Sequence, residues 1–289
     1  MTHNAEVWIT EIHEDYLAMG FRVERTLFSQ QSKFQKVDVV ETRGHGKMLF
    51  VDGCAMISER EEFVYHDMIA HVPLFTHPNP KRVLIIGGGD GGTAREVLRH
   101  PEVVRAVQVE IDEVVVEACK LHIPQTAQAF ENERLELLID DGLAYMANTE
   151  ESFDVVLVDS TDPIGPAAPL FGEDFYRNVH RVLADDGIVV AQGESSFYMA
   201  KEQRSIMESM KTSFPKVHVY NYHTLVYPGG LWSFMFASKG LCPIGNFDPS
   251  RVVNSGLKFK YYNSSMHRAS FCLPEFQKEL LAGLTNLDI

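Results

Sequence analysis

Two aspartates near the middle of the chain have the type and spacing for acid–base chemistry. Asp159 and Asp162 lie directly after an apolar run at 155–158 and before a Pro-Ile-Gly-Pro segment at 163–166. Acids at the end of a buried strand point into the crevice where α/β sheets bind ligands, and there a carboxylate can accept a proton. Metal binding is the alternative, but no His lies at ligand spacing in this acidic segment, so no metal is expected.

A glycine-rich loop at 87–92, Gly-Gly-Gly-Asp-Gly-Gly, follows another apolar run. The spacing of Gly87, Gly89 and Gly92 fits a dinucleotide fingerprint, but it fits a nucleoside cofactor such as S-adenosylmethionine equally well. Asp90 helps to separate the two, because a carboxylate in the loop repels a pyrophosphate and attracts a cation. Decarboxylated S-adenosylmethionine brings an ammonium and a sulfonium and no carboxylate, so Asp90 favours that cosubstrate.

Further acids end the two strands expected next along the chain. Glu110 lies where an acid in a doubly wound sheet accepts hydrogen bonds from ribose hydroxyls. Asp112 is instead expected to cap the following helix. Asp141, followed by Gly142, lies at the end of the next strand, where it can accept a hydrogen bond from an adenine amino group.

The charge of the chain excludes some partners. The 289 residues include 26 Lys and Arg against 40 Asp and Glu, a formal charge of −14. This sign disfavours nucleic acids and anionic membrane surfaces. Segment 140–186 holds eleven acids against two Arg residues, so much of the negative charge lies around the candidate site. We therefore expect a small cationic substrate, with no nucleic acid and no membrane as partners.

The compartment is expected to be the cytoplasm. The first residues lack the basic and apolar pattern of a signal peptide, and no apolar run is long enough to span a bilayer. The four cysteines are far apart in the sequence and lack metal-ligand spacing, so they are expected to be reduced packing residues.

The N-terminal part is predicted to form a small antiparallel sheet followed by a helix. Short β-prone runs at 21–28, 35–41 and 47–53 are separated by turn residues. Apolar residues at helical spacing then predict a helix over 59–75, with Ser58 as its N-cap.

After a Pro-Asn-Pro break at 78–80, strands and helices alternate. Helices are predicted over 93–99 and 113–121, and two strands at 216–223 and 231–238 are expected to form an antiparallel edge. Five nearly continuous apolar runs are typical of strands buried on both faces of a parallel sheet; they lie at 83–86, 107–111, 135–139, 155–158 and 188–191.

The predicted fold class is α/β: a doubly wound, Rossmann-like sheet of the methyltransferase type with a small N-terminal antiparallel β domain. We expect residues 1–77 to form the N-terminal sheet domain with its connecting helix. Residues 78–289 are then the catalytic domain.

These motifs together resemble the polyamine aminopropyltransferase family, which includes spermidine synthase. The resemblance extends over nearly the whole chain. It rests on the stretches 62–68, 83–92, 109–112, 139–142, 159–166 and 227–230. One departure is Asp67, where the family usually has Glu.

The resemblance implies a role for each matching residue. Asp159 corresponds to the catalytic acid/base. The diamine is expected to contact Tyr65, His66, Asp90, Asp159, Asp162 and Tyr227. The cosubstrate is expected to contact Gln35, Gly87, Gly89, Glu110, Asp141, Gly142 and Pro166. Neither a metal nor a further cofactor is implied.

The implied reaction transfers the aminopropyl group of decarboxylated S-adenosylmethionine to putrescine, giving spermidine and 5′-methylthioadenosine. The distal ammonium of the diamine is expected to remain charged near His66, while Asp159 takes the proton of the reacting end. Two alternatives stay open: a small-amine N-methyltransferase that uses intact S-adenosylmethionine, and a non-catalytic polyamine-binding protein. The resemblance also implies a homodimer or homotetramer.

Overall fold

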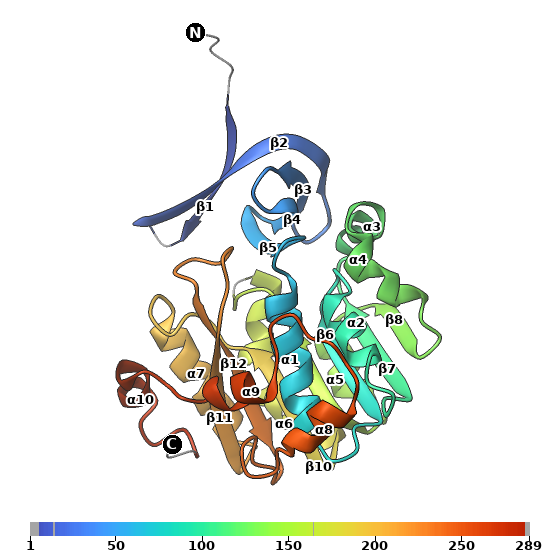
Figure 1. Cartoon of the computed structure of the whole chain (residues 1–289), viewed down its shortest axis with the longest axis vertical. Helices are drawn as coiled ribbons and strands as arrows, with labels where there is room; N and C mark the ends of the chain where they lie inside the picture. Colours follow the sequence, from blue (N-terminus) through green and yellow to red (C-terminus); the bar gives the residue numbers. More distant parts are fainter. Residues whose placement is uncertain (1–5, 14, 164, 287–289) are drawn as a thin grey trace.

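The computed structural model describes residues 6–13, 15–163 and 165–286, and the side chains of 165 and 166 lie outside the description. An antiparallel sheet begins the chain and lies over one end of the α/β domain (Figure 1). The three predicted N-terminal strands are confirmed, with two more at the edges of the sheet. In spatial order the strands are β1 (Val7–His13), β2 (Leu17–Gln31), β3 (Lys36–Thr42), β4 (Gly46–Val51) and β5 (Cys54–Ser58).

The second sheet has seven strands in the order β11-β12-β10-β9-β6-β7-β8. The five strands β10, β9, β6, β7 and β8 pair in parallel, and β12 and β11 add an antiparallel edge beside β10. The strands are β6 (Arg82–Gly87), β7 (Arg105–Glu110), β8 (Leu135–Ile139), β9 (Phe153–Asp159), β10 (Leu183–Gln192), β11 (Lys216–His223) and β12 (Leu231–Ser238). From β6 the chain adds β7 and β8 on one side of the sheet, and it then returns to add β9 and β10 on the other side. The carboxyl ends of β6 and β9 are therefore the expected ligand site, and this strand order confirms the doubly wound fold.

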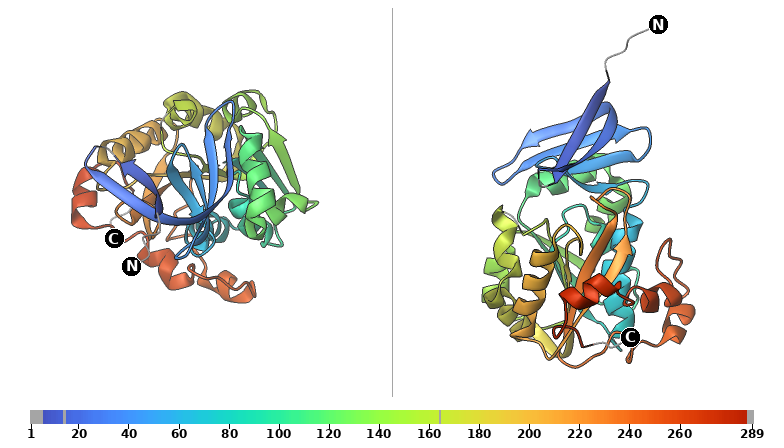
Figure 2. Two further views of the ribbon diagram at one scale, coloured as in Figure 1. Left: turned by 90° about the horizontal axis from the view of Figure 1, so that it is seen from above. Right: turned by 90° about the vertical axis from the view of Figure 1, so that its left-hand side faces the viewer.

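Helices cover both faces of this sheet (Figure 2). Alternate residues of β6 show why: Val83 and Ile85 pack with α1 and α2, whereas Leu84 and Ile86 face the core that includes α5, α6 and α7. The helices are α1 (Phe63–Thr76), α2 (Gly92–Leu98), α3 (Glu113–His122), α4 (Pro124–Ala127), α5 (Gly142–Asn148), α6 (Glu173–Val182), α7 (Ala200–Lys211), α8 (Pro249–Asn254), α9 (Ser264–Ala269) and α10 (Glu275–Leu280), with 3₁₀ turns at Gln128–Glu131 and Gly165–Phe171.

Helix α1 begins later than predicted, and the predicted Ser58 cap is wrong. The N-cap position is Glu62, which makes no side-chain cap bond, and the carbonyl of Ser58 accepts hydrogen bonds from the N–H groups of Glu61 and Glu62. The chain turns here before the helix starts, so Ser58 is too far upstream to cap it. In the described part of the chain, every helix is too short or too polar to cross a membrane.

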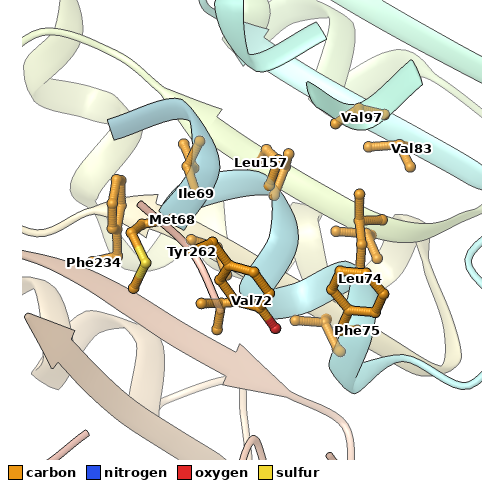
Figure 3. Packing of buried hydrophobic residues seen from close by; sticks show 14 of the residues in the cluster. Met68, Ile69, Val72, Leu74, Phe75, Val83, Val97, Leu157, Phe234 and Tyr262 are labelled. Carbon is orange, nitrogen blue, oxygen red and sulfur yellow. The ribbon is translucent and has the colours of Figure 1, made fainter. Parts of the chain in front are cut away.

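Nearly every side chain of α1 is buried, because the helix packs between the large sheet and the C-terminal segment. Figure 3 shows Met68 and Ile69 of α1 packed in this core. The helix also buries Asp67, whose Oδ2 accepts three backbone N–H groups from residues 260–262 at 2.9–3.1 Å. This carboxylate therefore ties the C-terminal segment to α1. The domain boundary at residue 77 stays a prediction.

Candidate active site

A cavity lies at the carboxyl ends of β6, β7 and β9, between the α/β domain and the N-terminal sheet. Nearly all of the predicted site residues line it, although they come from distant parts of the sequence. The lining includes Gln35, Tyr65, His66, Gly87, Gly89, Asp90, Glu110, Asp141, Gly142, Asp159, Asp162 and Tyr227. The remaining prediction, Pro166, has a side chain outside the described part of the structure.

The glycine loop is shaped to lie against Asp159. Gly87 pairs with Asp159 in the sheet, and the N–H of Gly88 donates to the Asp159 carbonyl at 2.8 Å. Both glycines have positive φ, 86° and 69°. A Cβ on Gly87 would lie 2.1 Å from the Asp159 carbonyl oxygen, and one on Gly88 would lie 2.8 Å from its Oδ2. Larger residues would therefore push the acid out of place.

The Asp159 carboxylate has the environment of a general base. Burial raises its pKa and the nearby Asp90 raises it further, whereas His66 lowers it; the net direction is upward. Thr93 Oγ1 donates to Asp159 Oδ2 at 2.6 Å and fixes the orientation of the carboxylate. A raised pKa brings a carboxylate closer to the pH at which it can accept and release protons. Thr93 was not predicted as a site residue.

His66 lies between two carboxylates. Its Nδ1 is 2.6 Å from Glu62 Oε2, and its Nε2 is 3.2 Å from Asp90 Oδ1. Burial lowers the pKa of the imidazole, but the charges and hydrogen bonds of Asp90 and Glu62 outweigh this and raise it to about 10. The ring also packs on the first residue of α2, where a Cβ on Gly92 would lie 2.1 Å from Cε1. This environment favours the imidazolium form of His66.

The expectation that no His joins the acidic cluster is corrected by the fold. Helix α1 brings His66 within 4.8 Å of the carboxylates of Asp90 and Asp159, a grouping that could hold a metal ion. An imidazolium, however, has no lone pair to give to a metal. The prediction that no metal is used stays a prediction.

A second group of acids forms the Asp162 end of the cavity. Asp162 accepts a hydrogen bond from Gln192 Nε2 at 3.1 Å, and Gln192 also donates to Glu194 at 2.8 Å. Glu11 of β1 lines the cavity beside Asp162, and burial, reinforced by Asp162 and opposed by the Ala55 N–H, raises its pKa to about 7. Burial likewise raises the pKa of Glu194 well above its usual value. His13 lowers the pKa of Asp162 without reversing its net rise, and a cationic ligand could balance these carboxylates further.

Glu11 and Glu194 were missed by the sequence analysis for different reasons. Glu11 lies in a strand without any motif, and only the docking of the N-terminal sheet brings it to the cavity. Glu194 follows β10 at the carboxyl end of the parallel sheet. The rule that ligands bind at these strand ends could therefore have found it.

Aromatic rings line the same cavity. The ring of Tyr227 lies 6.3 Å from that of Tyr65 and 5.0 Å from that of Trp232, measured between centroids. Tyr227 donates its hydroxyl hydrogen to the carbonyl of Met56 in β5 at 2.6 Å, and the Trp232 indole donates to the Pro228 carbonyl at 2.9 Å. The polar atoms of these two residues are thus used in backbone contacts, and their ring faces can contact a cation.

Several residues predicted to contact a nucleoside hydrogen-bond to one another. Glu110 Oε1 accepts from the N–H of Asp112 at 2.8 Å, and burial raises the pKa of Glu110 to about 7. Asp112 caps α3, as predicted, and its other oxygen accepts from Gln35 Nε2 at 2.9 Å. Asp141 caps α5. The ribose and adenine contacts of these residues stay predictions.

Two family models match the chain. Residues 62–246 match the spermine/spermidine synthase domain, and residues 7–59 match the spermidine synthase tetramerisation domain. A polyamine aminopropyltransferase of Clostridium botulinum (strain Eklund 17B / Type B) is 44% identical over 278 residues, which cover 96% of this chain and 98% of that protein. A polyamine aminopropyltransferase of Bacillus cytotoxicus is 43% identical and covers 96% and 99%, respectively.

Two solved structures of spermidine synthases are also similar to this chain. A spermidine synthase in complex with the transition-state analogue AdoDATO superposes with a TM-score of 0.93 at 41% identity, covering 95% of this chain and 94% of that one. A spermidine synthase from Thermotoga maritima has a TM-score of 0.92 at the same identity and coverage.

Proposed function

This chain belongs to the spermine and spermidine synthase family, whose members transfer aminopropyl groups, and we propose that it makes spermidine from putrescine and decarboxylated S-adenosylmethionine. The observation that supports these substrates best is the charge layout of the cavity. Several acids line it, among them Glu11, Asp90, Asp159 and Asp162. A diamine and a cationic cosubstrate supply positive charge to these acids beyond what His66 contributes beside Asp90 and Asp159.

Asp159 is proposed to act as the base. An alkyl amine resembles Lys, with a pKa of about 10.4, so neutralising it at pH 7 costs roughly 4 to 5 kcal/mol. The amine must lose that proton before its nitrogen can attack the methylene beside the sulfonium and displace 5′-methylthioadenosine. Asp159 is oriented by Thr93, and burial raises its pKa, so it is suited to take the proton. Binding both reactants in line raises the rate further, because the amine and the methylene are already oriented for attack.

The distal ammonium of putrescine is proposed to bind at the Asp162 end. His66 is the position favoured by the sequence, but both of its ring nitrogens face carboxylates and the ring is held as a cation. A second cation is better placed beside Asp162 and Glu11. On the other side, Asp90 is proposed to face the cationic propyl end of the cosubstrate, with Glu110 and Asp141 at its nucleoside.

We propose a homodimer or homotetramer assembled through the N-terminal sheets, in the cytoplasm. The match to a tetramerisation domain covers residues 7–59. Strand β1 exposes large apolar side chains, Val7 at 61%, Trp8 at 53% and Ile12 at 69%, on a surface that a second copy could cover. The location agrees with free cysteines at positions 54, 119, 242 and 272.

Product mass tests the reaction. The enzyme is incubated with putrescine and either decarboxylated or intact S-adenosylmethionine, and we expect a gain of one aminopropyl group with the former only. A gain of one methyl group, or none with either, would contradict the proposal.

The position of the distal ammonium is tested with n-butylamine, which lacks it. We expect kcat/KM for n-butylamine to fall well below that for putrescine in the wild type, and the gap to narrow in Asp162→Asn. Asp141→Asn, on the nucleoside side, is the matched control and should keep the gap. An unchanged gap in Asp162→Asn would place the ammonium elsewhere.

A further inference from the structure

A line of buried charges extends from the cavity into the space between α1 and α2. Arg95 of α2 donates Nη1 to Glu62 Oε1 at 2.9 Å and Nη2 to Glu62 Oε2 at 2.8 Å, a bidentate pair. Glu62 Oε2 is also the atom that contacts His66 Nδ1. The line then continues from His66 to Asp90, whose neighbour in the cavity is Asp159. Glu62 itself is 4% exposed and is not among the cavity-lining residues.

We propose that Glu62 is a positioning residue for aminopropyl transfer: fixed by Arg95, it holds His66 as a cation between Asp90 and Asp159 and so favours the ionised form of the Asp159 carboxylate. This inference rests on the function proposed above. Two buried carboxylates that lie close together tend to share one proton, which would leave the base occupied. A fixed cation beside them removes that tendency, and the fixed cation needs a carboxylate of its own outside the cavity.

The groups around His66 support this assignment. Glu62 at the N-cap of α1 and Tyr65 within α1 face the ring, as do Asp90 of the glycine loop and Asp159 of β9, and the backbone of α2 lies against it at Gly92. Glu61 is also near enough to be influenced by the charge of His66, but it hydrogen-bonds to the N–H of Leu225. Burial raises the pKa of Glu62, but His66 and Arg95 outweigh this and lower it to about 2. Glu62 is thus a permanent anion at neutral pH.

Glu96 provides a matched control within the same fold. It is 3% exposed, accepts a hydrogen bond from Arg95 Nε at 2.8 Å and lies 3.0 Å from a histidine, His71. That histidine is not part of the cavity lining. Glu62→Gln and Glu96→Gln therefore remove equivalent buried charges, but only the former reaches the site. Should Glu96→Gln fail to fold, Asp67→Asn, whose carboxylate also faces His71, takes its place.

The first measurement follows the protonation of His66 directly. Ring carbon and nitrogen signals of labelled histidine are followed by NMR from pH 6 to 10, with His66→Gln used to assign the resonance. We expect His66 to stay protonated above pH 8 in the wild type and in Glu96→Gln, and to titrate at least about one unit lower in Glu62→Gln. This readout requires no turnover, so it stands even if the proposed substrates are wrong. A neutral His66 at pH 7 in the wild type would overturn the inference.

The second measurement is the pH profile of kcat/KM for decarboxylated S-adenosylmethionine. With His66 neutral, Asp159 loses a charge that lowers its pKa, so the acid limb should move to higher pH by about one to three units in Glu62→Gln. Activity should fall at least about tenfold at pH 7 and recover in part at pH 9, while Glu96→Gln keeps the wild-type profile. A loss that is equal at every pH would indicate a merely structural role and refute the inference.

A double variant completes the test. If Glu62 acts through His66, adding Glu62→Gln to His66→Gln should shift the acid limb no further. A full additional shift would show that Glu62 acts by another route, which also refutes the proposal.

Discussion

Two groups of buried charges, one between α1 and α2 and one lining the cavity, behave in opposite ways. The α1–α2 network consists of Asp67, His71, Arg95, Glu96, Arg99 and His100. The cavity acids are Glu11, Asp90, Glu110, Asp159 and Asp162. Burial alone would raise the pKa of every carboxylate. In the network, His71 and the arginines reverse this and lower the pKa of Glu96, and His71 with backbone N–H groups lowers that of Asp67. Among the cavity acids Glu11, Glu110, Asp159 and Asp162, burial prevails and the pKa is raised.

The difference separates carboxylates that hold the fold from carboxylates that await a ligand. A buried acid whose cation is built into the chain contributes to stability, and removing it leaves the partner charge unpaired. A buried acid without such a cation destabilises the empty protein in its ionised form, and it is retained for what it binds. Substitutions of the cavity acids should therefore lower activity without loss of stability. Substitutions in the α1–α2 network should instead lower stability.

The largest effect is expected from Asp159→Asn. An amide cannot take the proton of the amine, so kcat should fall by about 10²- to 10⁴-fold. The melting temperature should stay the same or rise, because a buried acid with a raised pKa is removed. Steady-state kinetics and thermal unfolding of the same preparation check both. Near-normal turnover would refute the role of Asp159.

The opposite signature is expected from Glu96→Gln. The substitution removes the carboxylate that pairs with Arg99 and lies nearest to His71, and it should lower the free energy of unfolding by about 3 kcal/mol at pH 7. Because the folded-state pKa of Glu96 is depressed, its contribution is present above the unfolded value of about 4.5 and is lost as the pH falls below it. Urea unfolding at pH 7 and at pH 4 measures this, and the deficit should shrink at the lower pH. Loss of turnover with unchanged stability would erase the distinction between the two groups.

A smaller, pH-dependent effect is expected from Glu110→Gln. The pKa of Glu110 is raised to about 7 in the folded state, so its destabilising charge develops as the pH rises from about 4.5 to 7. Relative to the wild type, the variant without ligand should gain about 2 kcal/mol in free energy of unfolding between pH 5 and pH 8. Denaturant melts at the two pH values give the difference. A gain that is the same at both pH values would mean that the charge of Glu110 is already compensated.

The smallest effect is expected at the surface. Asp174 pairs with Arg177 at 2.7 Å on α6, but their side chains are 88% and 69% exposed. Asp174→Asn should change the free energy of unfolding by less than about 0.5 kcal/mol and leave kcat unchanged. The same unfolding and kinetic assays apply, and a larger change would show that acidity alone, without burial, matters here.

The strands of the large sheet could be predicted from the sequence because they are short apolar runs bounded by strong turn signals. The runs at 83–86 and 155–158 fall inside β6 and β9, and the hairpin β11–β12 has the predicted bounds. Strands β1 and β5 lie at the edges of the small sheet and were missed because their apolar residues, in Val-Trp-Ile-Thr-Glu-Ile-His and Cys-Ala-Met-Ile-Ser, do not alternate regularly with polar ones. The start of α1 was misplaced because an irregular turn, and not a side-chain cap, leads into it.

Within the site, the residues that carry a local motif were predicted, and their partners were not. The glycine loop and the Asp159–Asp162 pair have recognisable spacing at strand ends. Glu62 and Arg95 have no such signal, because their pairing depends on how α1 packs against α2, 33 residues further along the chain. A buried charge network is a property of packing, and sequence spacing alone does not define it.

The hydrogen bonds of Asp67 to the C-terminal segment also bear on how the protein is made. Its three N–H donors lie 193 to 195 residues downstream. At synthesis rates of 5–20 residues per second, the ribosome needs on the order of 10 to 40 s to reach them. During that interval α1 carries a carboxylate whose backbone donors do not yet exist. Completion of the α1 core is therefore expected to be a late event that follows translation of the C-terminal segment.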